Sequence, residues 1–287
     1  MLKRTRKSNF VRLFSKTPPG VVCPHFYELI LSNGCPFNCL YCYLKLTFRG
    51  NKSPVLFTNA WEQVEKELEK IPCGVFATGE LADSLAIEPP LLRPAIEYFR
   101  RQYNKYLLLT TKSINIDMLT KIDPTPQVFV SFSINSIIAW ENFEPSTPNP
   151  FKRIDAALKL KKQGWKIRIR LDPIIEHIGI NCYKEIIERI IDLSPDRVTL
   201  GTLRQYPGVH RFEKNAPRAG LKRAPDGRMR YPLEARAKIY SIIAEWLGFE
   251  PALCKETNEL WDYLGWDEKG CNCTIGCIQD GQNEGNL

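Results

Sequence analysis

Three cysteines lie close together near the start of the chain, and their spacing restricts what the chain can fold into. Cys35, Cys39 and Cys42 form the pattern C-x3-C-x2-C in one short loop. Such a loop can bring three thiolates to three irons of a cubane cluster, which leaves the fourth iron without a protein ligand. A cluster with four protein thiolates only transfers electrons, whereas an open iron can bind and reduce a small molecule. The pattern therefore predicts an iron–sulfur site with a vacant position.

Zinc binding and disulfide formation account for these cysteines less well. A zinc site normally has four ligands in two pairs, and no second C-x2-C or histidine pair lies nearby. A disulfide framework is typical of short secreted chains, whereas this chain has 287 residues and shows no apolar signal segment. Three structural cysteines gathered by chance in a loop of Gly, Pro and Asn would be more unusual still.

The composition indicates a cytoplasmic protein large enough for one sizeable core, either as a single α/β barrel-like domain or as two ordinary domains. The chain is 44% hydrophobic and has ten cysteines, which favours a reducing compartment. No stretch approaches the roughly eighteen apolar residues of a membrane span, so we expect no membrane contact. The net charge of +8 is uneven, because basic residues crowd the segment from Lys3 to Lys16 and the first acidic residue is Glu28. We expect that segment to be a solvated tail, with nucleic-acid contact as the alternative.

Short apolar segments alternate with amphipathic ones, which predicts an α/β fold with parallel strands. The predicted strands are Glu28–Ser32, Gly74–Thr78, Tyr106–Thr111, Val128–Ile134, Lys166–Ile174 and Arg197–Leu203. The predicted helices between them are Trp61–Ile71, Leu91–Tyr103, Ile116–Ile122, Phe151–Gln163 and Tyr183–Leu193. Six repeats favour a partial (β/α)6 TIM-like barrel, since a closed barrel of eight repeats needs about 250 residues. The cysteine loop then lies at the carboxyl rim of the strands, where parallel α/β folds place their chemistry.

We divide the chain into a basic N-terminal arm (1–27), the barrel core (28–250) and a cysteine-bearing C-terminal extension with a polar tail (251–287). A last core helix is predicted over Leu233–Leu247. The cysteines of the extension are Cys254, Cys271, Cys273 and Cys277. Four thiolates within so short a segment could ligate a second iron–sulfur cluster or zinc. Alternatively, Cys254 packs in the core and the other three are incidental thiols.

The cysteine spacing, with Tyr41 just before the third cysteine, resembles the radical S-adenosylmethionine (SAM) superfamily. In that superfamily the methionyl amine and carboxylate of SAM chelate the vacant iron, and electron transfer releases a 5′-deoxyadenosyl radical. The resemblance implies a 4Fe-4S cluster and SAM as cofactors. It also implies a reductant such as flavodoxin or ferredoxin as a partner.

Polar residues at the ends of the following strands are the candidate cofactor ligands. Gly79 and Glu80 resemble the motif that holds the SAM amine, since glycine permits close approach and a carboxylate pairs with an ammonium. Lys112 is placed to meet the SAM carboxylate, and Ser133 and Asn135 to bond the ribose or that carboxylate. Each has an ordinary alternative as a turn, a solvated lysine or a capping group.

Three segments resemble a narrower group, the spore photoproduct lyase family, whose members reverse a thymine dimer lesion in DNA. The segments are Gly34–Leu44, Phe132–Ser136 and Phe143–Thr147. The likeness implies that Cys35, Cys39 and Cys42 bind the cluster and that Lys112 and Ser133 bind the cofactor. It also implies that Tyr41 and Tyr43 match two active-site tyrosines. From their positions we expect Tyr41 to pack against adenine, and Tyr43 to face the substrate or relay a hydrogen atom. For both tyrosines, core packing is the alternative.

The chain departs from that family in two ways. Lyases carry a cysteine that returns a hydrogen atom to the product radical, and Glu80 stands at that place. A carboxylate O–H bond is far stronger than a thiol S–H bond, so Glu80 cannot take this role, and Cys73 lies near the opposite end of the strand. The segment Leu253–Thr257 resembles uncharacterised relatives of the lyase. The resemblance therefore supports a 4Fe-4S cluster and SAM in this chain more strongly than it supports the lesion-repair reaction.

The segment 211–230 holds seven basic and two acidic residues, where the lyases carry a hairpin that enters DNA. It predicts DNA as a partner, through salt-dependent phosphate contacts that include Arg228 and Arg230; a solvated basic loop is the alternative. We therefore expect a radical SAM enzyme that acts on nucleic acid. The alternatives are a radical SAM enzyme acting on a protein or small metabolite, and a non-catalytic iron–sulfur or zinc protein that binds nucleic acid.

Overall fold

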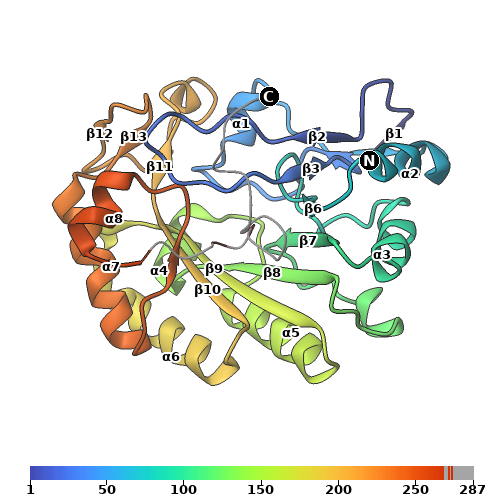
Figure 1. The fold of residues 1–287 in the computed structure, drawn as a ribbon. Helices are drawn as coiled ribbons and strands as arrows, with labels where there is room; N and C mark the ends of the chain where they lie inside the picture. Colours follow the sequence, from blue (N-terminus) through green and yellow to red (C-terminus); the bar gives the residue numbers. More distant parts are fainter. Residues whose placement is uncertain (268–270, 272, 274–287) are drawn as a thin grey trace.

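A computed structural model describes residues 1–267, 271 and 273, and it contains a central eight-stranded sheet (Figure 1). The strand order is β14-β10-β9-β8-β7-β6-β3-β2, and every neighbouring pair is parallel except β2 and β3. The strands are β2 (Val11–Leu13), β3 (Tyr27–Leu29), β6 (Gly74–Ala77), β7 (Lys105–Thr111), β8 (Val128–Ile134), β9 (Lys166–Ile174), β10 (Arg197–Thr202) and β14 (Ala252–Leu253). The six predicted strands are all present and adjacent in sequence order, which confirms the partial-barrel prediction.

The helices among the described residues are α1 (Leu44–Thr47), α2 (Trp61–Glu69), α3 (Leu92–Arg100), α4 (Ile137–Phe143), α5 (Pro150–Lys162), α6 (Lys184–Leu193), α7 (Leu233–Leu247) and α8 (Asn258–Leu264). On the outer face of the central sheet, α3 packs against β7 and β8, and α5 packs against β8 and β9 (Figure 1). The predicted helix over 116–122 was wrong, because only a 3-10 turn (Leu119–Lys121) forms there. Pro124 and Pro126 follow directly, and proline disfavours a helical residue before it.

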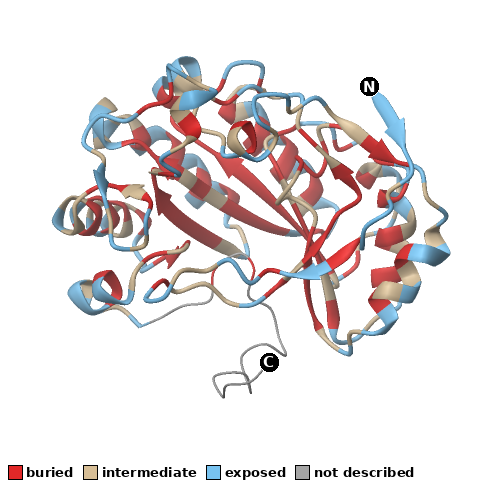
Figure 2. Cartoon of the chain, turned by 90° about the horizontal axis from the view of Figure 1, so that it is seen from above, coloured by how far each residue is buried: buried red, intermediate tan, exposed pale blue. Residues whose placement is uncertain are grey.

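The central strands are buried on both faces, which explains their nearly continuous apolar sequence. Every residue of β8 is buried, and Figure 2 shows the buried strands at the centre of the molecule. Helices α3 and α5 pack against the outer face. On the inner face, Phe14, Phe26, Cys271 and Cys273 belong to one buried cluster with strand residues such as Leu108. Residues of the N-terminal arm and of the C-terminal extension therefore pack against the inner face of the sheet.

The N-terminal arm is part of the fold, so the prediction of a solvated tail was wrong. Strand β1 (Leu2–Arg4) pairs with β5 (Val55–Phe57), which also pairs with β4 (Ser32–Asn33), and β2 extends the central sheet. The Glu67 carboxylate accepts hydrogen bonds from the amides of Phe10 and Val11 at 2.7 and 2.9 Å. Phe10 is fully buried. Apolar residues interleaved with the basic ones therefore anchor the arm.

Two further segments border the open end of the barrel. A small antiparallel sheet has the order β11-β13-β12, with β11 (Arg204–Gln205), β12 (Lys222–Arg223) and β13 (Met229–Arg230). Strand β14 pairs with β10, so the segment after α7 joins the main sheet. Among the described residues, no helix is both long and apolar enough to cross a membrane.

Candidate active site

The predicted site residues meet at one cavity of about 650 Å³. Those that line it are Cys35, Cys39, Cys42, Tyr41, Tyr43, Gly79, Glu80, Lys112 and Ser133. They come from the loop after β4 and from the carboxyl ends of β6, β7 and β8. Asn135 does not line the cavity and is fully buried behind its wall. The topology thus brings together residues that are separated by up to about a hundred positions in the sequence.

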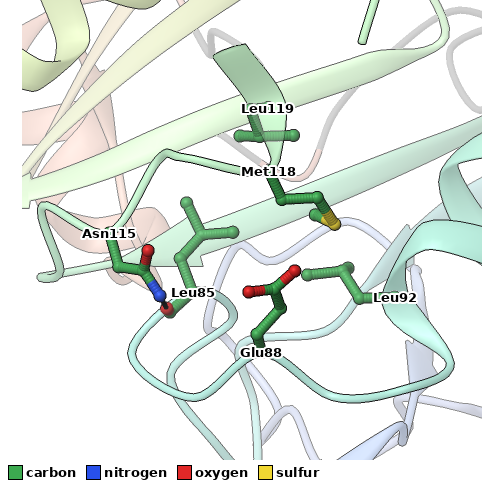
Figure 3. Close-up of a pocket in the computed structure, with 6 residues that line it drawn as sticks. All are labelled: Leu85, Glu88, Leu92, Asn115, Met118 and Leu119. Carbon is green, nitrogen blue, oxygen red and sulfur yellow. Dashed lines mark hydrogen bonds between the residues drawn. The ribbon is translucent and has the colours of Figure 1, made fainter. Parts of the chain in front are cut away.

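A second pocket has room for only about one water molecule, with a volume of about 10 Å³ (Figure 3). In this pocket the Asn115 amide donates a hydrogen bond to the Leu85 carbonyl at 3.3 Å. Apart from Asn115 and Glu88, its lining is apolar. This pocket offers no group of reactive side chains.

Backbone contacts fix the cysteine loop at the rim. Gly34 has φ +76°, and a Cβ there would lie 2.5 Å from the carbonyl oxygens of Lys52 and Ser53, so glycine is required. The amide of Asn38 donates to the Pro145 carbonyl at 3.2 Å, and that of Leu40 to the Phe143 carbonyl at 2.9 Å. The loop is therefore attached to the segment after α4.

Burial favours the protonated form of the three loop thiols when no metal is bound. Burial raises the pKa of Cys35 to about 12, with Asp83 adding to the rise, and burial also raises the pKa of Cys39 and Cys42. A metal must displace these protons, because the thiolate is the ligand. The described residues contain no group of three Cys, His, Asp or Glu able to hold one metal ion. Three thiols on one cavity wall fit instead a cluster that offers each thiolate its own iron.

A buried carboxylate, Glu144, organises the wall behind the cysteine loop. Its Oε1 accepts hydrogen bonds from the Tyr41 hydroxyl, from Lys112 Nζ at 3.1 Å and from Asn135 Nδ2 at 3.0 Å. Its Oε2 accepts from Arg153 Nη2 at 2.7 Å, and both side chains are fully buried. The sequence pattern indicated Glu144 only as part of a motif and did not reveal this role.

The charge of Glu144 follows from these partners. Burial alone would raise its pKa, but Lys112, Arg153 and the hydrogen bonds from Tyr41 and Asn135 hold the pKa well below its usual range. The carboxylate is thus ionised at neutral pH. It orients Lys112, whose Nζ also lies 5.7 Å from the centroid of the Tyr41 ring. Tyr41 and Asn135 therefore support the wall through Glu144.

Gly79 and Glu80 lie where β6 ends. A Cβ on Gly79 would lie 2.6 Å from the Thr110 Cβ on β7, so packing between strands already requires glycine. The Tyr43 hydroxyl donates a hydrogen bond to the Glu80 carbonyl oxygen. The nearby Asp83 carboxylate accepts from Thr111 Oγ1 at 2.6 Å and from the Lys112 amide at 2.7 Å. The ends of β6 and β7 are therefore held in a fixed relation.

The segment 211–230 divides into buried and exposed basic residues. Arg230 is 1% exposed, and its guanidinium donates to Asp226 Oδ2 at 2.7 and 2.8 Å. Arg228 is also buried and lies 5.3 Å from the Tyr206 ring centroid. The predicted phosphate contact was therefore wrong for Arg230, whereas it stays a prediction for Arg228, which lines the cavity. The exposed basic residues are Arg211, Lys214, Arg218, Lys222 and Arg223.

The cysteines of the C-terminal extension face the same cavity. Cys254, Cys271 and Cys273 line it, whereas Cys277 lies outside the described residues. Cys23, from the arm, also lines the cavity, and the sequence reasoning did not single it out. None of the described cysteines takes part in a disulfide bond. Cys73 and Cys182 do not contribute to the cavity.

A partial barrel of parallel strands with a three-cysteine loop at its carboxyl rim defines the class of radical SAM proteins. A sequence model described as spore photoproduct lyase matches residues 22–242. The chain belongs to the spore photoproduct lyase family.

Two curated relatives are spore photoproduct lyases. The one from Bacillus subtilis (strain 168) is 29% identical over 218 residues, which cover 73% of this chain and 64% of the relative. The one from Clostridium acetobutylicum is 27% identical over 222 residues, with coverages of 73% and 64%. The match thus spans less than two thirds of the length of these relatives.

Solved structures share the fold. A spore photoproduct lyase complexed with dinucleoside spore photoproduct has a TM-score of 0.72 at 22% identity, covering 88% of this chain and 80% of that one. A variant of the lyase with bound AdoMet and the same dinucleoside has a TM-score of 0.68 at 22% identity, with coverages of 79% and 75%. SuiB of Streptococcus suis, bound to the precursor peptide SuiA, has a TM-score of 0.55 at 14% identity, with coverages of 82% and 49%.

Proposed function

We propose that this protein is a radical SAM enzyme in which Cys35, Cys39 and Cys42 hold a 4Fe-4S cluster. The observation that carries the proposal is that these thiols line one cavity together with Glu80, Lys112 and Ser133. When bound, the cluster would supply the electron that cleaves SAM and produces a 5′-deoxyadenosyl radical. A protein that only bound a cluster would not need side chains suited to an amine and a carboxylate beside it.

The side chains around the cavity have distinct roles in this proposal. Glu80 pairs with the SAM ammonium, and Lys112 pairs with its carboxylate. Glu144 holds Lys112 in place and keeps the wall rigid. Tyr43, which is 37% exposed at the cavity, faces the substrate.

Electron paramagnetic resonance of the reduced, anaerobically reconstituted protein tests the cofactor assignment. Addition of SAM should change the spectrum of the wild-type cluster, because an iron gains new ligands. The variant Cys35→Ala/Cys39→Ala/Cys42→Ala should show no SAM-dependent change. A spectrum that ignores SAM in the wild type would contradict the proposal.

We further propose that the substrate is a nucleic acid. The small sheet β11-β13-β12 borders the cavity through Arg204, Gln205 and Arg228. Both residues of β12, Lys222 and Arg223, are exposed. A basic edge next to the opening can neutralise phosphates while a base enters the cavity. Solved relatives that carry a dinucleoside lesion support the same substrate class.

The salt dependence of DNA binding tests this substrate class. If Lys222 and Arg223 contact phosphates of duplex DNA, Lys222→Ala/Arg223→Ala should reduce the log–log salt slope by up to about two units. The matched control Lys159→Ala/Lys162→Ala removes two exposed charges from α5 and should leave the slope unchanged. Binding that is undetectable or insensitive to salt would favour a peptide or small-metabolite substrate. Product analysis with irradiated and undamaged DNA would then identify the reaction.

A further inference from the structure

Four cysteines outside the C-x3-C-x2-C loop converge on the cavity. They are Cys23, Cys254, Cys271 and Cys273, here called the lumen cysteines. Cys23 lies between β2 and β3, Cys254 directly follows β14, and the other two lie near the C-terminal end. Thus three segments of the chain, at residues 23, 254 and 271–273, each bring thiols to one cavity.

The lumen cysteines are neighbours of one another. Cys271 raises the pKa of Cys273, so the two thiols are close neighbours. Burial raises the pKa of Cys23 to about 11, and Cys254 and Cys271 add to that rise. Cys271 and Cys273 also belong to one apolar cluster, against which Cys23 packs.

Cationic side chains surround these thiols. Arg170 Nη2 on β9 and Arg204 Nη2 on β11 each donate to the Cys254 sulfur at 3.2 Å. Both guanidiniums also donate to Asp172, at 2.6 and 2.9 Å. Lys255 is the next residue, and it too lines the cavity. Thiols that merely filled space would not need such partners, whereas guanidiniums can offset the negative charge of thiolates and donate to cluster sulfurs.

The surroundings of the thiols favour an iron–sulfur cluster over zinc. A structural zinc ion needs its four thiolates around a single centre, and the described residues contain no group of three ligands that could hold one ion. The guanidiniums of Arg170 and Arg204, which donate to the Cys254 sulfur, could also donate to the inorganic sulfides of a cluster, which a zinc ion lacks.

We propose that Cys23, Cys254, Cys271 and Cys273 ligate a second 4Fe-4S cluster that faces the same cavity. In this proposal Cys23 supplies the fourth ligand. Four protein thiolates saturate this cluster, so its function is to transfer or store electrons beside the SAM site. The proposal goes beyond the proposed function, because it concerns the iron content of the chain whether or not SAM is cleaved.

Iron and sulfide analysis of the full chain after anaerobic reconstitution tests the proposal. The wild type should bind about eight irons and eight sulfides per chain. The variant Cys35→Ala/Cys39→Ala/Cys42→Ala should keep about four of each, and Cys254→Ala/Cys271→Ala/Cys273→Ala should also keep about four. The control Cys73→Ala/Cys182→Ala should keep about eight, because these cysteines lie outside the cavity.

Single variants decide the fourth ligand. Cys23→Ser should lower the iron content toward about four per chain, whereas Cys277→Ser should leave it at about eight. After reduction, the variant that lacks the loop cysteines should also show the resonance of the second cluster, unchanged by SAM. This measurement does not depend on whether the variants of the lumen cysteines fold. A wild type with about four irons, or one bound zinc in place of the second cluster, would overturn the proposal. Formation of 5′-deoxyadenosine, measured in parallel, reports separately on the proposed function.

Discussion

The two groups of cysteines that face the cavity are built in opposite ways. The loop cysteines lie within eight consecutive residues, 35–42, and backbone hydrogen bonds to residues 143–145 hold their loop. The lumen cysteines come from both ends of the chain, and side chains of β9 and β11 surround them. Local spacing therefore determines the first group, whereas only the completed fold creates the second.

The carboxylates in the cavity walls beside the two groups of cysteines also differ in how they are paired. Behind the loop cysteines, Glu144 joins four side chains and its charge is fully enclosed. Beside the lumen cysteines, Asp172 joins Arg170 and Arg204, which also contact a thiol. Removing a carboxylate should therefore be more damaging at Glu144 than at Asp172. Variants at the two walls and in the loop test these differences.

Glu144→Ala should have the largest effect on stability. It leaves the fully buried Arg153 guanidinium without its carboxylate, and breaking a buried ion pair costs about 3–5 kcal/mol. Urea unfolding of the metal-free protein measures this loss. The control Glu97→Ala breaks a partly exposed pair with Arg100 and should cost no more than about 1 kcal/mol. Equal losses in both variants would show that Glu144 does not organise the wall.

Gly34→Ala should destabilise the protein more than its positive φ angle alone would predict, because the added Cβ also clashes with backbone atoms. Gly34 and Gly20 have φ of +76° and +74°, but a Cβ on Gly34 would lie 2.5 Å from backbone oxygens, whereas a Cβ on Gly20 would have nothing within 4 Å. Gly20→Ala should cost about 1–2 kcal/mol. Gly34→Ala should cost about 2–5 kcal/mol, because overpacking adds to the strain. Urea unfolding of both variants makes the comparison, and matching losses would refute it.

Glu80→Gln should weaken SAM binding without removing the cluster. A hydrogen bond to a charged group contributes about 1.5–3 kcal/mol, so the dissociation constant should rise by roughly one to two orders of magnitude. Equilibrium binding to the reconstituted protein measures it. Glu88→Gln makes the same chemical change at an exposed residue outside the cavity and should have no effect. Unchanged affinity with lost turnover would assign Glu80 to the substrate instead.

Asp172 should make stability depend on acid pH. Burial alone would raise its pKa, but Arg204 and Arg170 lower the pKa to about 2 from the ordinary 3.8. A carboxyl whose pKa is lower in the folded state contributes stability above its unfolded pKa and loses it as the pH falls toward its folded pKa. This contribution is about 2 kcal/mol. The difference in unfolding free energy between the metal-free wild type and Asp172→Asn should therefore shrink as the pH falls from about 5 to about 3; a constant difference would argue against it.

Much of the fold could be predicted because its signals are local. Apolar runs specified the six strands, and α7 begins and ends where the amphipathic pattern places it, at Leu233 and Leu247. The two-residue strand β14 is too short to leave a pattern. The arm was misjudged because its charge is conspicuous, whereas the buried packing of Phe10 depends on residues more than fifty positions away.

At the candidate site, too, the sequence predicts residues in local motifs but not contacts between distant segments. The loop cysteines, Glu80, Lys112 and Ser133 could be predicted because each lies in a motif or at a strand end. Glu144 meets Tyr41 across 103 positions, and Cys23 meets Cys254 only when both ends of the chain enter the barrel. Likewise, the charge pattern alone could not separate the buried Arg230 from the exposed Lys222, because burial depends on the partner Asp226.

The formation of 5′-deoxyadenosine tests the central claim most directly. The reconstituted wild type, incubated anaerobically with SAM and dithionite, should form it, and Cys73→Ala/Cys182→Ala should form it equally well. Cys35→Ala, Cys39→Ala and Cys42→Ala should each abolish it, because each removes a thiolate from the proposed cluster. Continued formation by a variant that lacks all three loop cysteines would contradict the assignment of this site.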